Sequence, residues 1–247
     1  MGLTDINIRE KEFHNKLQSK KVGRFENIFY KSLYNINEDF FSYIEKKANK
    51  SKILDFGCGT GDFIEKLTKY NPKKIVGIDI SEISIEKAKE KTKNINTDIN
   101  LYVDNCEKTK FEDNSFDIVY GTGILHHLEF NKCLDEIHRI LKFNGSLVFV
   151  EPLGTNPIIN LYRKLTPNSR SKDEHPLINK DFEYINNKFT NINVKYYGFL
   201  TVIFFPFYKL PEKSKFFKLL ASLDQSLFKI KILRKFAWSV LITAKKN

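Results

Sequence analysis

The segment ILDFGCGTGDF (residues 53–63) constrains the fold of this chain more than any other. An apolar run typical of a buried β-strand ends in three glycines at alternate positions, Gly57, Gly59 and Gly61. Glycine adopts positive φ easily and lets another group approach the backbone closely. The residues from Asp62 onward have the apolar spacing of a helix. The sequence therefore predicts a strand, a tight turn and a helix, which together form a ligand-binding device.

The rest of the chain repeats the alternation of apolar strands with amphipathic helices. Ser81 is a predicted helix N-cap, and Asn144-Gly145 marks the end of a helix that precedes the fifth strand. Such an alternation is typical of an α/β fold with a mostly parallel sheet. The predicted strands are 52–56, 74–80, 100–104, 116–121, 146–151, 191–199 and 235–246.

The length of 247 residues suits one domain with insertions. The net charge is +11, of which residues 151–247 carry +10, and 35 of the 41 basic residues are lysine. Arginine, the better reader of bases, is scarce, which argues against a nucleic-acid partner.

The first 30 residues lack the apolar core of a signal peptide, so we expect a cytoplasmic protein. The three cysteines are far apart in the chain and odd in number. Free thiols are expected, with neither a disulfide framework nor a metal site.

The glycine motif favours one of two ligand classes. A dinucleotide site of the form G-x-G-x-x-G would need glycine at position 62, where the chain has Asp62. The chain instead has Asp55 two residues before Gly57 and no basic residue in the turn. A carboxylate there suits a cationic ligand with an amino group and a sulfonium better than a pyrophosphate.

In this motif, D-x-G-x-G-x-G, the chain resembles the class I S-adenosylmethionine-dependent methyltransferases. The block FEDNSFDIVYGTGILHHL (111–128) is similar to a sequence block that is typical of the methyltransferase type 11 branch, which includes ubiquinone-biosynthesis-like enzymes. The resemblance is good over residues 50–151 and weak elsewhere. It implies a Rossmann-like, doubly wound sheet of seven strands in the order 3-2-1-4-5-7-6, mostly parallel with the last strand antiparallel.

The resemblance also implies how the cofactor, S-adenosylmethionine, is held. Asp79, at the tip of the second strand, is placed to accept both ribose hydroxyls, and Ile80 packs on the adenine ring. The step after the third strand, Asp104-Asn105-Cys106, reaches the adenine amino group, and Asp55 lies near the cofactor's amino group. The complete predicted cofactor-binding set is Asp55, Gly57, Cys58, Gly59, Gly61, Asp79, Ile80, Asp104, Asn105, Cys106 and Gly121.

Methyl transfer from a sulfonium is a direct in-line displacement, and a hydroxyl acceptor also needs a base. His126 and His127, after the fourth strand, are candidates because they lie at the sheet edge where the ligand binds. His175 follows Asp173 and Glu174 directly in the chain, and it is either a base or a latch on a loop. His14 and His138 are expected to be packing or surface histidines.

Residues 1–50 are expected to form helices that cover the cofactor, and 51–247 the methyltransferase domain. Insertions at about 152–177 and 200–232 are expected to cap the acceptor site. The segment 199–219 has seven aromatic residues among lysines, and Pro206 interrupts its apolar run. The segment is too short to span a bilayer. It can line an apolar acceptor pocket, lie on an anionic membrane surface or pack as core.

The predicted function is transfer of a methyl group from S-adenosylmethionine to the oxygen of a small, partly apolar acceptor. The first alternative is a lipid-like acceptor at the inner membrane face, reached by peripheral contact through 199–219. An RNA methyltransferase is the second alternative, but GTGILHH after the fourth strand is not a target-base motif such as N-P-P-Y. The sequence does not fix the oligomeric state.

Overall fold

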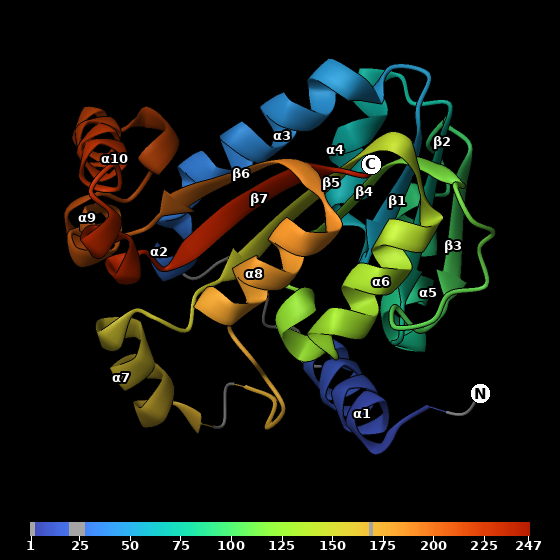
Figure 1. Ribbon diagram of the computed structural model, residues 1–247, viewed down its shortest axis with the longest axis horizontal. Helices are drawn as coiled ribbons and strands as arrows, with labels where there is room; N and C mark the ends of the chain where they lie inside the picture. The colour runs from blue at the N-terminus through green and yellow to red at the C-terminus, as the bar shows by residue number, and fades with distance from the viewer. Residues whose placement is uncertain (1–2, 20–27, 168–169) are drawn as a thin grey trace.

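The computed structural model describes residues 3–19, 28–167 and 170–247. One seven-stranded sheet runs through the molecule (Figure 1), and β7 is antiparallel to both of its neighbours while the other strands are parallel. The predicted order is therefore confirmed. Across the sheet the strands are β3 (Ile99–Val103), β2 (Lys74–Asp79), β1 (Lys52–Phe56), β4 (Phe116–Thr122), β5 (Leu141–Pro152), β7 (Ser239–Lys245) and β6 (Thr190–Tyr197).

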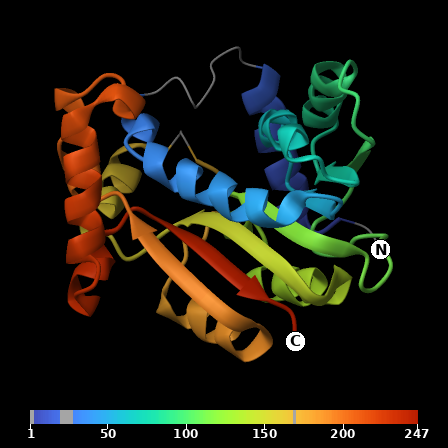
Figure 2. The same ribbon diagram turned by 90° about the horizontal axis from the view of Figure 1, so that it is seen from above.

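Helices cover both faces of the sheet (Figure 2). The first face carries α3 (Tyr34–Ala48), α4 (Asp62–Leu67) and α5 (Glu82–Thr92), and the second carries α6 (Phe130–Ile140) and α8 (Asn179–Lys188). The apolar side chains of β1 alternate between these faces, with Ile53 in one buried cluster and Leu54 and Phe56 in the other. Two cores back to back explain why the central strands are apolar throughout.

The remaining helices lie outside these two layers. The helix α1 (Asp5–Ser19) packs on α5, while α7 (Pro157–Leu165) belongs to the first predicted insertion. The second insertion contains α9 (Leu200–Ile203) and α10 (Lys215–Leu227), which pack on each other beyond the ends of β6 and β7 (Figure 1). A short helix, α2 (Ile28–Lys31), precedes α3.

The ends of the predicted strands need small corrections. The last strand begins at Ser239 rather than at residue 235, because residues 231–236 form 3₁₀ turns. The fifth begins at Leu141 rather than 146, with a register irregularity against β4. The positive φ of 60° at Asn144 places a bend inside this strand rather than ahead of it. The predicted N-cap at Ser81 is confirmed, since its side chain accepts a hydrogen bond from the amide of Ser84 at 3.1 Å.

Candidate active site at the carboxyl ends of the central strands

The glycine turn joins β1 to α4. Its three glycines have φ angles of +83°, +50° and +78°, values that an L-residue with a side chain rarely adopts. The amides of Gly57 and Cys58 donate to the carbonyl of Ile78, at 2.9 and 2.8 Å, so the turn is fastened to β2. These two amides hold the turn in shape and are therefore not free to donate to a ligand.

Space around the turn differs sharply between its glycines. A Cβ at Gly57 would lie 2.6 Å from the side chain of Ile124, and one at Gly61 would lie 3.2 Å from Ala88. A Cβ at Gly59 would meet no atom within 4 Å. The turn is therefore packed at both ends and open in the middle, where a ligand can approach the backbone.

Asp79 is tied to the same turn. One carboxylate oxygen accepts the amide of Gly59 and the other accepts the amide of Ser81, both at 2.9 Å. Burial raises the pKa of Asp79, and these two hydrogen bonds oppose the rise. A carboxylate has about four lone-pair sites, so two remain for the hydroxyls of a sugar.

Asp55 lies beneath the turn rather than at its surface. Because side chains alternate along a strand, it falls on the α3 face of the sheet, where the hydroxyl of Tyr120 donates to it at 2.7 Å. Only 3% of the residue is exposed. Burial raises the pKa of Asp55 to about 8, with smaller contributions from Asp79 and Asp62, while the Tyr120 hydrogen bond opposes it.

The residues after β3 form a hydrogen-bonded turn of their own. Asp104 accepts the amide of Asn105 at 2.9 Å, and the side chain of Asn105 donates to Asn7 of α1 at 3.1 Å. Ile80 is half-buried beside Asp79. The predicted adenine-contacting residues therefore lie next to α1.

Three predicted members of the site are buried for reasons of packing. Burial raises the pKa of the Cys58 and Cys106 thiols well above the ordinary value, so neither is a ready nucleophile. A Cβ at Gly121 would lie 2.5 Å from the ring of Phe149 and 2.8 Å from the carbonyl of Phe56. Glycine at 121 is thus required by close approach within the sheet.

Glu151, at the end of β5, organises the loop after β4. Its fully buried carboxylate accepts the amides of Ile124 and Leu125 at 2.9 and 2.8 Å, and it lies 2.7 Å from Nδ1 of His126. Burial, and then the neighbouring His127, lower the pKa of His126. The carboxylate fixes the ring through Nδ1, so Nε2 is the ring nitrogen that Glu151 does not engage. The sequence analysis missed Glu151, although an acidic residue at the end of an apolar strand was the available signal.

His127 lies against α1. Its Nδ1 is 3.1 Å from a carboxylate oxygen of Glu10, and its ring meets that of His14 edge-on, with centroids 5.1 Å apart. The centroids of His126 and His127 are 4.1 Å apart. Three histidines from two distant segments therefore adjoin one another, and the structure favours the packing alternative for His14 over the surface one.

His175 contributes to the same region mainly through its backbone. Its amide donates to the carbonyl of His126 at 2.6 Å, while its side chain is 52% exposed and lies 3.3 Å from Asp181. Next to it, Asp173 accepts two hydrogen bonds from Arg9 of α1, at 2.8 and 2.9 Å. These contacts favour the latch alternative for this loop over the base alternative.

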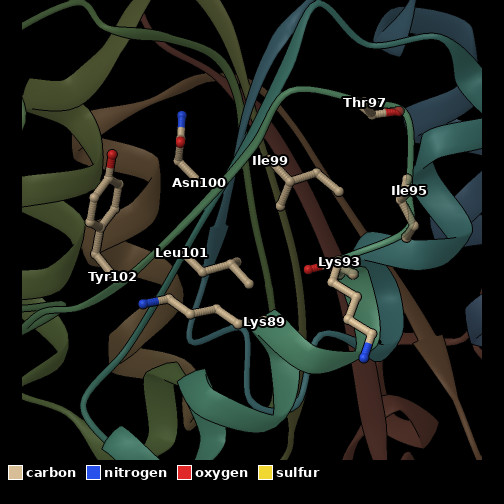
Figure 3. A pocket seen from close by; sticks show the side chains of 9 residues that line it. Lys89, Lys93, Ile95, Thr97, Ile99, Asn100, Leu101 and Tyr102 are labelled. Carbon is tan, nitrogen blue, oxygen red and sulfur yellow. The ribbon is translucent and has the colours of Figure 1, made fainter.

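A hollow of about 360 Å³ lies elsewhere, beside β3 and the end of α5 (Figure 3). Lys89, Lys93 and Tyr102 are among the side chains around it. Several of its lining residues precede β3, so it extends toward the end of the strand opposite to the glycine turn. It is not part of the candidate site.

Known proteins resemble this chain in both sequence and fold. A family model described as "Methyltransferase domain" matches residues 54–149. A demethylmenaquinone methyltransferase from Staphylococcus haemolyticus is 33% identical over 60% of this chain and 64% of that protein. Another, from Staphylococcus saprophyticus, is 30% identical over 66% of this chain and 72% of that protein.

Two solved structures illustrate the likeness in fold. The N-methyltransferase NodS from Bradyrhizobium japonicum, in complex with S-adenosyl-L-homocysteine, has a TM-score of 0.66 at 14% identity, covering 96% of this chain and 98% of its own. The magnesium protoporphyrin IX methyltransferase from Synechocystis, also with that product bound, has a TM-score of 0.66 at 11% identity over the same shares.

The fold, the glycine turn with Asp79 beside it and the matching sequences define the class. This chain belongs to the class I S-adenosylmethionine-dependent methyltransferases, in the type 11 branch. Its alignment with the first of the relatives above spans just under two thirds of that protein. Among the described residues, no helix combines the length and apolarity that crossing a bilayer requires.

Proposed function

We propose that this protein transfers the methyl group of S-adenosylmethionine to a small, partly apolar acceptor that carries a hydroxyl on a quinone-like ring. One observation carries the proposal. The open backbone at Gly59 adjoins a loop in which Glu151 holds His126, because Ile124 of that loop packs against Gly57. A cofactor bound at the glycine turn and the proton-accepting side chain of His126 would then lie next to each other, at the carboxyl ends of the strands. The relatives named for demethylmenaquinone support the ring chemistry.

In this proposal the cofactor lies along the ends of β1, β2 and β3. Asp79 binds the ribose hydroxyls, Ile80 covers the adenine and the turn at Asp104 meets the adenine amino group. The helix α1 covers this part of the site, since it already contacts the residues after β2 and β3. Asp55 supports the turn from below, where its carboxyl group is buried beside Tyr120.

His126 acts as the base. Methyl transfer needs the acceptor atom in line with the departing sulfur, and such positioning contributes about 7–11 kcal/mol. Removal of the hydroxyl proton adds a factor of about 10² to 10⁴ in rate. We retain oxygen as the methylated atom. A product methylated at a ring carbon would contradict only this part of the proposal.

Substitutions separate cofactor binding from chemistry. Asp79→Ala is expected to weaken S-adenosylhomocysteine binding, measured by titration calorimetry. His126→Gln and Glu151→Gln are expected to lower turnover of a demethylated naphthoquinol about 10²- to 10⁴-fold with unchanged product affinity. His138→Gln, on α6, is the matched control. No heat with S-adenosylhomocysteine would overturn the methyltransferase assignment, and full turnover in both His126→Gln and Glu151→Gln would remove the proposed base.

An apolar face on the second insertion supports an acceptor that resides in a membrane. The exposed side chains of this face are Ile203, Phe204, Phe207, Leu210, Phe216, Leu219 and Leu223, and Lys209, Lys213, Lys215 and Lys218 are exposed among them. Ring contacts join Phe204 to both Phe207 and Phe216, at 6.1 and 6.2 Å. Lysines around an apolar surface match an anionic bilayer. We therefore propose that this face binds the surface of an anionic membrane.

A further inference from the structure

We propose that Glu10, His14 and His127 form a binding site for one divalent transition-metal ion, with His126 and Glu174 on its border. One ligand atom from each of the first three residues lies within 4.8 Å of the others. The same holds for His126, His127 and Glu174. His127 is common to both groups, so the two sets form one continuous cluster.

The distances between these three ligand atoms are close to those around a bound metal ion. The same oxygen of Glu10 lies 3.1 Å from Nδ1 of His127 and 3.6 Å from Nε2 of His14. Bonds of about 2.0–2.1 Å to a shared ion would place neighbouring ligand atoms about 3.0–3.4 Å apart. Small side-chain adjustments would bring all three atoms into a single coordination sphere.

Two of the three ligand atoms are buried without a satisfactory hydrogen bond. The side chains of Glu10 and His127 are 3% and 2% exposed. The Glu10 oxygen and His127 Nδ1 face each other, yet neither makes a hydrogen bond of acceptable geometry. A buried carboxylate oxygen and a buried ring nitrogen that lack hydrogen bonds are each costly. A bound cation would remove that cost and satisfy both atoms at once.

The surrounding residues hold the ligands in place. The second oxygen of Glu10 accepts a hydrogen bond from the hydroxyl of Ser171. His126 is fixed by Glu151 at 2.7 Å, and Glu174 is 3.6 Å from Arg170. Outer contacts of this kind orient ligands and raise the affinity for the metal.

The ligand chemistry identifies the class of ion. Two imidazole nitrogens with one carboxylate oxygen are the ligand set of catalytic zinc sites and of non-haem iron(II) sites. Magnesium and calcium prefer all-oxygen ligands. We therefore infer Zn²⁺ or Fe²⁺, with open positions that His126 and Glu174 border.

The location gives the ion a role in the proposed reaction. Glu10 and His14 are one turn apart on α1, whereas His127 follows β4 in the loop that packs against the glycine turn. The ion would join α1 to that loop and polarise an acceptor oxygen bound at its open positions. This role rests on the proposed function, whereas the ligand set does not.

The test measures metal binding without donor or acceptor. Untagged protein is stripped with a chelator and titrated with Zn²⁺ by calorimetry, and with Co²⁺ by visible absorption. We expect one ion per chain and a cobalt spectrum typical of mixed nitrogen and oxygen ligation. Glu10→Gln and His127→Asn are expected to weaken binding at least about tenfold. Glu12→Gln and His138→Gln are matched controls on α1 and α6 and should bind as the unaltered protein does.

Two outcomes would overturn the proposal. The first is the absence of Zn²⁺ and Co²⁺ binding by stripped protein that circular dichroism shows to be folded. The second is equal binding in the ligand variants and the controls, which indicates an adventitious ion only. S-adenosylhomocysteine affinity, measured on the same stripped protein, is an independent readout of the proposed methyltransferase function. If metal binding fails while product binding persists, only the metal proposal is lost.

Discussion

Asp55 links the candidate site to the pH dependence of folding stability. Its carboxyl group is buried under the glycine turn beside Tyr120, and its pKa is raised to about 8, chiefly by burial. The free carboxylate of an unfolded chain titrates near 3.9. Between these values the folded protein keeps a proton that the unfolded chain loses, so stability falls as pH rises.

We expect Asp55→Asn to remove this part of the pH dependence. For the unaltered protein the contribution of Asp55 has a slope of up to about 1.4 kcal/mol per pH unit in the window from about 4 to 8. The free energy of unfolding by urea, measured at pH 5, 6, 7 and 8, should therefore favour the variant increasingly toward pH 8. Parallel curves for the two proteins would contradict the buried, protonated state of Asp55.

The glycines of the turn give a second residue-scale prediction. Alanine at either position 57 or 59 must adopt positive φ, at a cost of roughly 1–2 kcal/mol. Gly57→Ala also clashes with Ile124 and should lose about 1–3 kcal/mol more. Gly59→Ala has no such clash, but its methyl group fills the open space of the site. We expect Gly57→Ala to have the larger loss of stability in denaturant unfolding.

For Gly59→Ala, titration calorimetry should show at least about a tenfold loss of S-adenosylhomocysteine affinity, which corresponds to about 1.4 kcal/mol. Unchanged affinity would place the cofactor elsewhere.

Among the elements, α1 is attached to the body by polar contacts. Among the residues of α1 whose burial is described, Asn7 and Glu10 are the buried ones, and Arg9 is paired with Asp173 on the insertion. An element with little buried apolar surface opens locally at low free energy.

Amides of α1 are therefore expected to exchange with solvent deuterium faster than those of α3, whose buried residues are Ile36, Phe40, Ile44 and Ala48. Addition of S-adenosylhomocysteine should slow exchange in α1 and leave α3 unchanged, if α1 covers the cofactor. Equal protection with and without the product would separate α1 from the cofactor site.

The helix α10 has two apolar stripes on adjoining sides, about 100° apart around its axis. Phe217 and Leu220 are buried against Tyr208, whereas Phe216, Leu219 and Leu223 are exposed at helical spacing. Packing in the core, one of the three alternatives for this segment, therefore explains only the buried stripe of α10 and not the exposed one.

We expect the protein to co-sediment with vesicles that contain anionic phosphatidylglycerol and not with neutral phosphatidylcholine vesicles. Leu219→Ser and Phe207→Ser should reduce binding, while Ser222→Ala on the same helix serves as control. Retention by neutral vesicles, or a dimer that Leu219→Ser disrupts, would contradict the membrane assignment.

At the scale of the whole molecule, the site depends on strands that are distant in sequence. The residues proposed to bind the cofactor come from the loops after β1, β2 and β3. The loop after β4 is held by hydrogen bonds from its backbone amides to Glu151 of β5. A ligand that bridges these strands binds the folded state alone, and it stabilises that state by an amount that grows with the logarithm of the ligand concentration above its dissociation constant.

S-adenosylhomocysteine at 100 times its dissociation constant is therefore expected to add about 2.7 kcal/mol to the free energy of unfolding. Thermal unfolding monitored by circular dichroism should show a single transition that moves to higher temperature. A shift in Asp79→Ala equal to that of the unaltered protein would contradict the role proposed for Asp79.

The sequence by itself determined the class of fold, and the resemblance of its motifs to a known family supplied the strand order. Apolar alternation and the glycine turn are local properties, since they follow from backbone geometry within about ten residues. The ends of the fifth and last strands, at Leu141 and Ser239, were misjudged because pairing partners decide where a strand begins.

Only the tertiary structure decided which side chains meet. Glu10 and His14 come from α1, His127 follows β4, and Glu151 lies at the end of β5. No spacing in the chain predicts this cluster, so the sequence pointed to no metal site. Asp55 likewise had the expected residue type but an environment set by Tyr120 from another strand. Burial and proximity arise when distant segments pack, and they decide the protonation and partners of these groups.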